Sequence, residues 1–240
     1  MRANNGWDDP DGNSRADAPL SEQLREGTRA EHRAAESQDF VENLLAGDLD
    51  VAAYADLAAQ QLEIYRALED AALPVRRDAR GAGLAFAELE RVPSIERDLA
   101  HLHGAGWREQ IRILPATLTY AARLRDAGGS LPEYAAHAYT RYLGDLSGGQ
   151  IIKRMMQRRY GMGAEGLAFY DFPEIPKAKP FKDLYRERLD ALGLDAAETA
   201  RAVAEAQQAF RLNRAMFAEL GAEHAVRGGA ERRGARADVA

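Results

Sequence analysis

The sequence predicts an all-α protein that forms one domain. Between residues 20 and 220, apolar residues recur at intervals of three and four, which is the spacing of helices that bury one face. No segment shows the alternating pattern of a half-buried strand, and the sequence has no internal repeat. Glycine and proline separate the helical segments as stop and start signals. A chain of 240 residues is long enough to bury one sizeable core.

The helices can be placed in order from their caps and breakers. Ser21 is a candidate N-cap for a first helix that continues to about Ser37. A second helix begins at Val51 and ends before Pro74, and residues 75–93 are interpreted mainly as a loop. Further helices are predicted over 94–103, 107–114, 115–127, 131–160, 181–192 and 196–220, with an irregular connection at 165–176 and Gly221 closing the last helix.

Both ends of the chain are expected to be flexible tails around a domain that spans 20–220. Residues 1–19 are polar and acidic, and residues 221–240 are rich in Gly, Ala and Arg. No apolar run reaches the roughly 20 residues that a membrane span needs, and the first residues lack the apolar core of a signal peptide. We therefore expect a cytoplasmic protein.

Charge and composition exclude several classes of function. The net charge of −6 argues against nucleic acid as the main partner, because phosphate binding needs a basic field. The absence of cysteine excludes disulfides, thiolate metal sites, iron–sulfur clusters and cysteine nucleophiles. The sequence also lacks the Glu-x-x-His pairs of a di-iron bundle, a P-loop, a Gly-x-Ser-x-Gly motif and a His-Glu-x-x-His motif.

The most informative segment is YTRYLGDLSGGQ, residues 139–150, which places Gly144, Gly148 and Gly149 inside a predicted helix. Each interior glycine costs roughly 1 kcal/mol relative to alanine, so three of them need a reason. A flat ligand that must approach bare backbone supplies that reason, because glycine has no Cβ. Asp145 and Ser147 lie among these glycines and would bring polar chemistry to the plane of the ligand.

His32 is the best candidate for a metal ligand among the five histidines. Arg25, Arg29, His32 and Glu36 share one helical stripe. Glu36 could accept a proton from one imidazole nitrogen and leave the other for a metal, while the two arginines could meet the carboxylates of a flat ligand. The alternative is a solvated helix face with an ordinary charged pair.

Two further patterns are ambiguous. Lys182 and Arg186 form a basic pair one turn apart, although exposed helix charges most often serve solubility. Phe210, Asn213 and Phe217 form a stripe of a kind that usually belongs to the core.

The string HAYTRYLGDLSGGQ at residues 137–150, with the segments 20–36, 165–172 and 181–189, resembles the heme oxygenase family, and the resemblance covers about 20–220. It implies a helical bundle that holds heme between a proximal helix and a kinked distal helix. It also implies that heme b is both cofactor and substrate. With O2 and reducing equivalents, the ring would be opened to biliverdin, releasing carbon monoxide and ferrous iron.

The resemblance implies a role for each candidate residue. His32 corresponds to the iron ligand and Glu36 to the acid that holds its second nitrogen. Asp145 corresponds to the acid that orders distal water, with Tyr139 and Arg141 behind that water network. The other correspondences are the glycines of the distal helix, Gly144, Gly148 and Gly149; the propionate-side cations, Arg25, Arg29, Lys182 and Arg186; and the residues that line the pocket or join the network, Tyr65, Phe210, Asn213 and Phe217.

The chain departs from the family pattern at a few positions. Arg25 and Arg29 stand where lysine is common, and Val41 stands where methionine is common. The resemblance implies a redox partner, either a ferredoxin or a flavoprotein reductase. No membrane anchor is expected, because the end of the chain is not apolar, and a monomer is the default.

Two other classes of function fit part of this pattern. A heme carrier would share the His32 pocket but would gain nothing from a proton source such as Asp145. A helical interaction protein would use the glycines for tight helix packing, and a heme titration would distinguish it.

Overall fold

The computed structural model describes the backbone of residues 18–237 and the side chains of residues 18–226. The helices in chain order are α1 (Leu20–Gly27), α2 (Arg29–Glu36), α3 (Asp39–Ala46), α4 (Val51–Val75), α5 (Val92–His103), α6 (Trp107–Gln110), α7 (Pro115–Ala127), α8 (Leu131–Gly144), α9 (Gln150–Tyr160), α10 (Ala178–Asp190) and α11 (Ala196–Ala237). Three shorter helical turns are η1 (Ala87–Leu89), η2 (Asp145–Gly149) and η3 (Ala168–Tyr170). Residues 18–237 contain no strand, which confirms the predicted all-α class.

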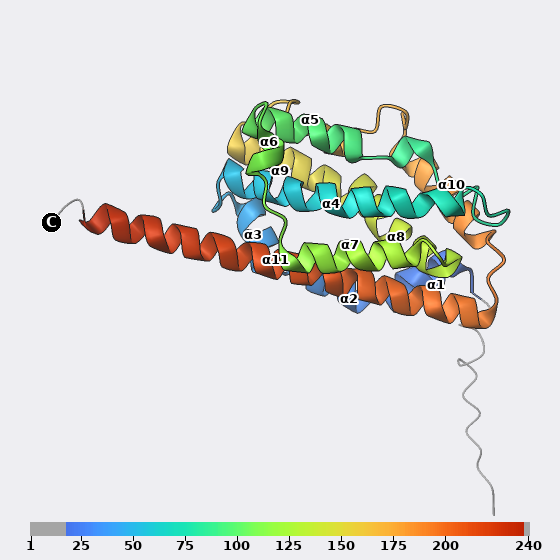
Figure 1. Cartoon of the computed structure of the whole chain (residues 1–240). Coiled ribbons are helices and arrows are strands. Elements are labelled where there is room, and N and C mark those ends of the chain that lie inside the picture. The colour runs from blue at the N-terminus through green and yellow to red at the C-terminus, as the bar shows by residue number, and fades with distance from the viewer. Residues whose placement is uncertain (1–17, 238–240) are drawn as a thin grey trace, which may run out of the picture.

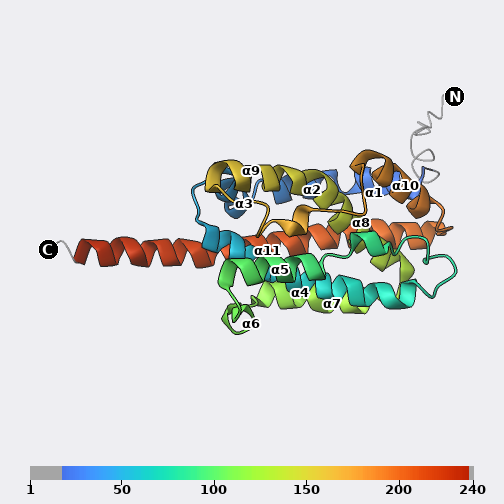
Figure 2. The same ribbon diagram turned by 90° about the horizontal axis from the view of Figure 1, so that it is seen from above.

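Helix α4 lies at the centre of the bundle, where it contacts α5, α7, α8 and α11 (Figures 1 and 2). Its residues are apolar on most sides, as expected of a helix that is surrounded by others. The Asp50 carboxylate caps its first turn by accepting a hydrogen bond from the Ala53 N–H at 2.8 Å. Helix α11 packs across α1, α2, α3, α7 and α8, so it connects the N-terminal helices to the rest of the bundle.

The predicted first helix is two helices with a break at Thr28. The backbone of Thr28 has φ −110° and ψ 6°, and its hydroxyl donates to the Leu24 carbonyl at 2.7 Å. The N-cap of α1 is Pro19 rather than Ser21. The Ser21 N–H and hydroxyl instead donate to the Asp190 carboxylate at 2.7 and 2.9 Å, so Ser21 joins α1 to α10.

Several other boundaries differ from those predicted. Helix α3 was missed; it buries Phe40 and Leu44, one turn apart, and ends at Gly47 with φ 84°. Pro74 lies in the last turn of α4 instead of following it. The short helix at Trp107 ends at Gln110, four residues before the predicted end.

The largest difference is at the end of the chain, where the prediction that Gly221 closes the last helix is wrong. Helix α11 continues to Ala237 and extends beyond the body of the protein (Figure 1). Residues just past Gly221 still contact the bundle, since Glu223 pairs with Arg112 at 3.1 Å and His224 pairs with Asp56 at 3.1 Å. A C-terminal tail therefore does not begin at Gly221. The predicted N-terminal tail lies almost entirely outside the described residues.

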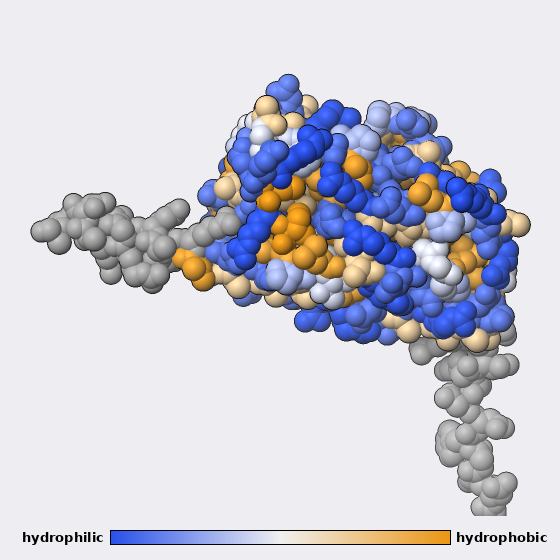
Figure 3. Space-filling model, viewed as in Figure 1, coloured by the Kyte–Doolittle hydropathy of each residue, from blue (hydrophilic) through white to orange (hydrophobic). Residues whose placement is uncertain are grey.

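The visible surface in Figure 3 is mostly hydrophilic, with apolar side chains in small groups. The large apolar residues that are exposed come from six different places in the chain: Val51, Leu73, Leu118, Ile151, Leu184 and Val226. Within the described part of the chain, no helix has the length and apolar character needed to cross a bilayer.

Candidate functional site

The glycine motif forms a widened turn inside a long helical element. Helix α8 continues into η2, a π-helix over Asp145–Gly149, and then into α9. One turn of π-helix within an α-helix interrupts the regular hydrogen-bond ladder and often marks a functional site. The predicted long helix over residues 131–160 is therefore present, and its irregular centre coincides with the glycines.

The three glycines of this turn have two different functions. Gly144 and Gly148 are exposed, and a Cβ built on either would meet no described atom within 4 Å, so both present bare backbone to open space. Gly149 is buried, and its Cβ would stand 3.2 Å from the Tyr170 ring. We expected all three glycines to face a ligand. The structure corrects this for Gly149, which is glycine because Tyr170 packs against it.

The segment around η3 holds the π-helix in place. The Asp98 carboxylate on α5 accepts the backbone N–H groups of Ala168 and Phe169 at 2.8 and 2.7 Å. The Gln150 side-chain amide donates to the Tyr170 carbonyl at 2.9 Å, which ties the start of α9 to η3. Sequence reasoning missed Asp98, because a single acid within a helical pattern gives no signal of its partner 70 residues away.

Asp145 is the acid of this site. It is only 8% exposed and accepts a hydrogen bond from the Tyr65 hydroxyl. Burial raises the pKa of Asp145 to about 6, while Arg141 and the Tyr65 hydrogen bond oppose a larger rise. A carboxyl group with a pKa near 6 can both hold and release a proton close to neutral pH.

Arg141 is a buried cation beside this acid. Its Nη1 donates to the Asn213 side-chain oxygen at 2.9 Å, its Nη2 donates to the Gln61 side-chain oxygen, and its guanidinium carbon lies 5.0 Å from the centroid of the Tyr65 ring. The structure therefore brings three predicted residues, Tyr65, Arg141 and Asn213, into one network with Asp145. Tyr65 is fully buried, so it belongs to the network and not to an open pocket wall.

His32 lies on the exposed face of α2 and keeps the predicted arrangement. Its side chain is 56% exposed, and its Nδ1 lies 3.4 Å from Oε2 of Glu36. Because Glu36 engages Nδ1, Nε2 is the nitrogen that is available to a metal. The imidazole packs against the edge of Phe210 on α11, with ring centroids 5.6 Å apart.

Helix α11 connects the two halves of the site. Phe210 contacts His32, and Asn213, one turn later, binds Arg141. A single turn of α11 therefore lies beside both the exposed imidazole and the buried network that contains Asp145.

The predicted cations of α1 and α2 are paired with neighbouring acids. Arg25 lies 3.2 Å from Glu26 and 3.7 Å from Glu22, and Arg29 also pairs with Glu26. All of these side chains are well exposed, so the pairs are weak and their cations can exchange partners at little cost.

The cations of α10 border the π-helix. The Lys182 ammonium donates to the Ser147 hydroxyl at 2.9 Å, and Arg186 pairs with Asp183 at 2.8 Å. Burial raises the pKa of Tyr139, and the positive charges of Arg186 and Arg25 act against that rise, which places both cations near Tyr139 on α8. Cations from α1 and α10 thus gather around one end of the glycine motif.

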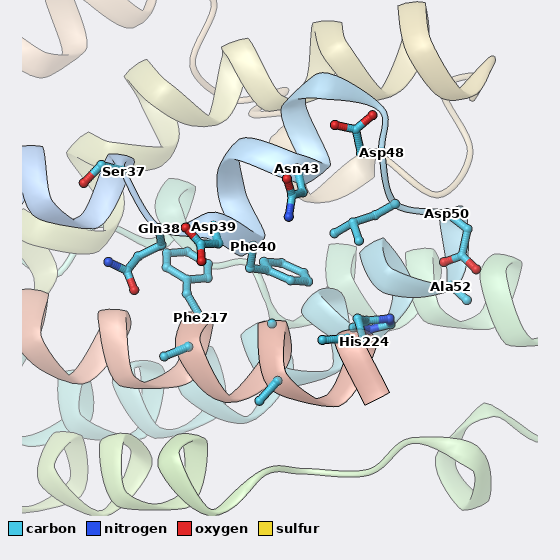
Figure 4. Close-up of a pocket in the computed structure, with 15 residues that line it drawn as sticks. Ser37, Gln38, Asp39, Phe40, Asn43, Asp48, Asp50, Ala52, Phe217 and His224 are labelled. Carbon is cyan, nitrogen blue, oxygen red and sulfur yellow. The ribbon is translucent and has the colours of Figure 1, made fainter. Parts of the chain in front are cut away.

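Phe217 lies away from the imidazole. Its ring stacks against Phe40 of α3 with centroids 6.2 Å apart. Both rings line a cavity of about 1080 Å³ between α3, the start of α4 and α11, with His224 and several polar side chains around it (Figure 4). Neither His32 nor Asp145 lines this cavity.

These residues fit a flat, anionic ligand that carries a metal ion. His32 offers one fixed, accessible imidazole nitrogen. Gly144 and Gly148 leave open the space that a Cβ would fill. The cations of α1 and α10 can meet the acidic groups of such a ligand, and Asp145 supplies a buried acid next to the bare backbone.

Comparison with known proteins gives a consistent result. The family model described as heme oxygenase matches residues 18–219. A protein named heme oxygenase 1 from Synechocystis is 39% identical over 202 residues, covering 84% of each chain. Human heme oxygenase 1 is 40% identical over 84% of this chain and 71% of its own length. The crystal structure of heme oxygenase-1 from Synechocystis in complex with heme superimposes with a TM-score of 0.84 and 36% identity, covering 91% of this chain and 99% of that one.

Proposed function

The chain belongs to the heme oxygenase family, and we propose that it binds heme between α2 and the junction of α8 with η2, with His32 as the iron ligand. The enzyme opens heme to biliverdin with release of carbon monoxide and ferrous iron, using O2 and reducing equivalents. The observation that carries the proposed site is the pair of contacts on one turn of α11, from Phe210 to His32 and from Asn213 to Arg141. These contacts support one site that combines a metal ligand with a buried acid.

On the proximal side, His32 would bind iron through Nε2 while Glu36 holds Nδ1. An acid that accepts the Nδ1 proton fixes the tautomer of the ring and makes the other nitrogen a better ligand. Phe210 limits rotation of the imidazole by packing against its edge. Bound heme supplies the iron that binds O2 and the ring that is oxidised.

On the distal side, Gly144 and Gly148 would allow the ligand plane to approach the backbone, and Gly149 would hold the turn against Tyr170. Asp145 would pass protons to the reacting oxygen through ordered water, because its pKa of about 6 lets it exchange protons near neutral pH. Tyr65 holds the carboxyl in position, and Arg141 limits how far its proton affinity rises.

Cations at the edge of the site would set the orientation of heme. Arg25, Arg29, Lys182 and Arg186 are proposed to bind the propionates, and Ser147 and Tyr139 lie beside the last two. Their present acid partners are exposed, so replacing a carboxylate of the protein by one of the ligand costs little.

The test is a hemin titration of His32→Ala, with His101→Ala as a matched control on α5. The His101 side chain is similarly exposed, at 49%. We expect the wild type and His101→Ala to bind hemin with a histidine-ligated spectrum and to produce biliverdin. We expect His32→Ala to lose that spectrum and its turnover, and to regain both with added imidazole. Wild-type spectra and turnover in His32→Ala without imidazole would refute the ligand assignment.

We further propose a cytoplasmic monomer that receives electrons from a ferredoxin or a flavoprotein reductase. A sequence without cysteine fits a reducing compartment. Measured turnover with each donor in turn distinguishes the two redox partners, and the solution mass of the purified protein tests the monomer.

A further inference from the structure

Gln61 is a buried polar residue on α4 that the sequence pattern did not single out. It lies one turn before Tyr65, is 9% exposed, and lines a small cavity whose other residues are aromatic or aliphatic: Tyr54, Leu57, Ala58, Ile95, Phe169 and Tyr170. A side-chain amide in such surroundings is costly unless it is hydrogen-bonded. The Gln61 oxygen has a partner, because it accepts a hydrogen bond from Nη2 of Arg141.

Gln61 completes the contacts that fix the Arg141 guanidinium. Asn213 binds Nη1, Gln61 binds Nη2, and the guanidinium lies over the ring of Tyr65. Nε of Arg141 is buried without a partner among the described residues. An aliphatic residue at position 61 would therefore leave a second N–H of a buried cation unpaired, so the guanidinium would be expected to move.

Movement of Arg141 would reach Asp145 through Tyr65. Tyr65 donates to the Asp145 carboxylate and lies beneath the guanidinium, so the position of Arg141 and the Tyr65 hydrogen bond depend on each other. The charged or titratable groups that act on Asp145 come from α4 (Tyr65), from α8 (Arg141) and from Arg91 at the start of α5. Gln61 contacts one of these groups directly and precedes another by one helical turn.

We propose that Gln61 is a positioning residue for heme oxidation, which fixes Arg141 against Tyr65 and thereby holds the Asp145 carboxyl in its working position. This inference rests on the proposed function of Asp145 as the proton-exchanging acid. It adds a polar contact from α4, on the side of Arg141 opposite to no other assigned residue of that helix except Tyr65.

The test compares Gln61→Leu with Gln60→Leu, the same change at the preceding position of the same helix. Gln60 is also buried, but its side chain bonds to the Leu114 N–H at 2.9 Å and the Thr117 hydroxyl at 2.8 Å, near the start of α7. Loss of a buried amide is thus common to both variants, whereas loss of the Arg141 contact is confined to Gln61→Leu.

The first readout is the titration of the Asp145 carboxyl in the heme-free protein, followed by carbon-13 NMR and assigned with Asp145→Asn. We expect Gln61→Leu to raise the titration midpoint by at least about half a pH unit, because the cation that stabilises the ionised carboxylate is no longer held. We expect Gln60→Leu to keep the wild-type midpoint, even if it lowers the melting temperature.

The second readout is biliverdin formation as a function of pH. We expect Gln61→Leu to bind hemin as the wild type does, to turn over about tenfold more slowly, and to show a pH profile shifted in the same direction as the NMR midpoint. Gln61→Met, which also lacks an acceptor oxygen, replaces Gln61→Leu if the leucine variant does not fold.

The outcomes separate this inference from the proposed function. A wild type that neither binds hemin nor forms biliverdin would overturn the proposed function itself. A functional wild type together with an apolar variant at position 61 that keeps the wild-type midpoint and turnover would overturn the role of Gln61 alone. A midpoint that moves equally in Gln60→Leu would overturn it as well.

Discussion

Asp145 couples the chemistry of the site to the stability of the protein. Its pKa of about 6 in the folded state exceeds the value of about 3.9 for an unperturbed aspartate, because the carboxyl is buried. The folded state therefore binds this proton more tightly than the unfolded state does. The stabilising contribution is complete below about pH 4 and is lost as the pH rises through 6.

The Asp145→Asn variant tests this linkage. A shift of two pKa units corresponds to about 3 kcal/mol, and asparagine cannot ionise. We therefore expect the free energy of unfolding of Asp145→Asn, relative to the wild type, to rise by up to about 3 kcal/mol between pH 4 and pH 7, measured by urea denaturation of the heme-free protein. Asp183→Asn, in an exposed ion pair, controls for the loss of one acid. A difference between Asp145→Asn and wild type that is constant with pH would contradict the burial effect.

Sequence reasoning works best at this scale for residues that are neighbours on one helix. The pair His32 and Glu36 was predicted from a spacing of four, and the structure places the two side chains together. Gln61 and Asp98 were not found, because their functions depend on partners about 70 to 80 residues away in the sequence. A single polar residue in a helical pattern does not reveal which element it will meet.

At the scale of the elements, the π-helix separates glycines that serve the ligand from one that serves packing. We expect Gly148→Ala to be as stable as the wild type or up to about 1 kcal/mol more stable, because its Cβ would enter open space and alanine favours helix. We expect Gly149→Ala to be destabilised by about 1 kcal/mol or more, because its Cβ would press against Tyr170.

Thermal denaturation and hemin titration of the two variants check this prediction. Gly148→Ala should keep its fold and lose affinity for hemin or O2, since the new methyl group occupies the ligand face. Gly149→Ala should instead show its main loss in melting temperature. A reversed order of stability between these two variants would show that the division between the glycines is wrong.

The helices themselves were largely predictable, and their irregularities were not. Helices α4, α7 and α8 begin at or within one residue of the predicted starts, because Pro115, the turn at Gly128–Gly129 and the apolar spacing are local signals. The break at Thr28 and the π-helix arise from packing between elements, which local propensity does not contain. Helix α3 was missed because it is short, and it is held in place by its contacts with α9 and α11.

At the scale of the whole molecule, the extended α11 sets where the folded unit ends. The predicted boundary at Leu220 came from Gly221, yet the helix continues and its next turn contacts other elements. We expect a chain that ends after Leu220 to be about 1 to 3 kcal/mol less stable than a chain that ends after Val226. The shorter chain loses the pair of Glu223 with Arg112 and the contacts of His224 with Asp56 and Phe40.

Urea denaturation of both truncated chains measures this difference. His224→Ala in the full chain is the matched variant, because it removes one of the lost contacts and leaves the helix intact. Equal stability of the two truncated chains would restore the boundary at Leu220.

The π-helix also fixes the rotational phase of everything that follows it. Successive residues of a helix are separated by about 100° around its axis, so deleting one residue between Asp145 and Gly149 would turn α9 by roughly that angle. Lys153 would swing away from Asp171, and the Tyr160 hydroxyl would lose the Leu44 carbonyl that it now meets at 2.8 Å. Single-residue deletions here would therefore be punished at the far end of α9, so the length of this segment is constrained independently of its chemistry.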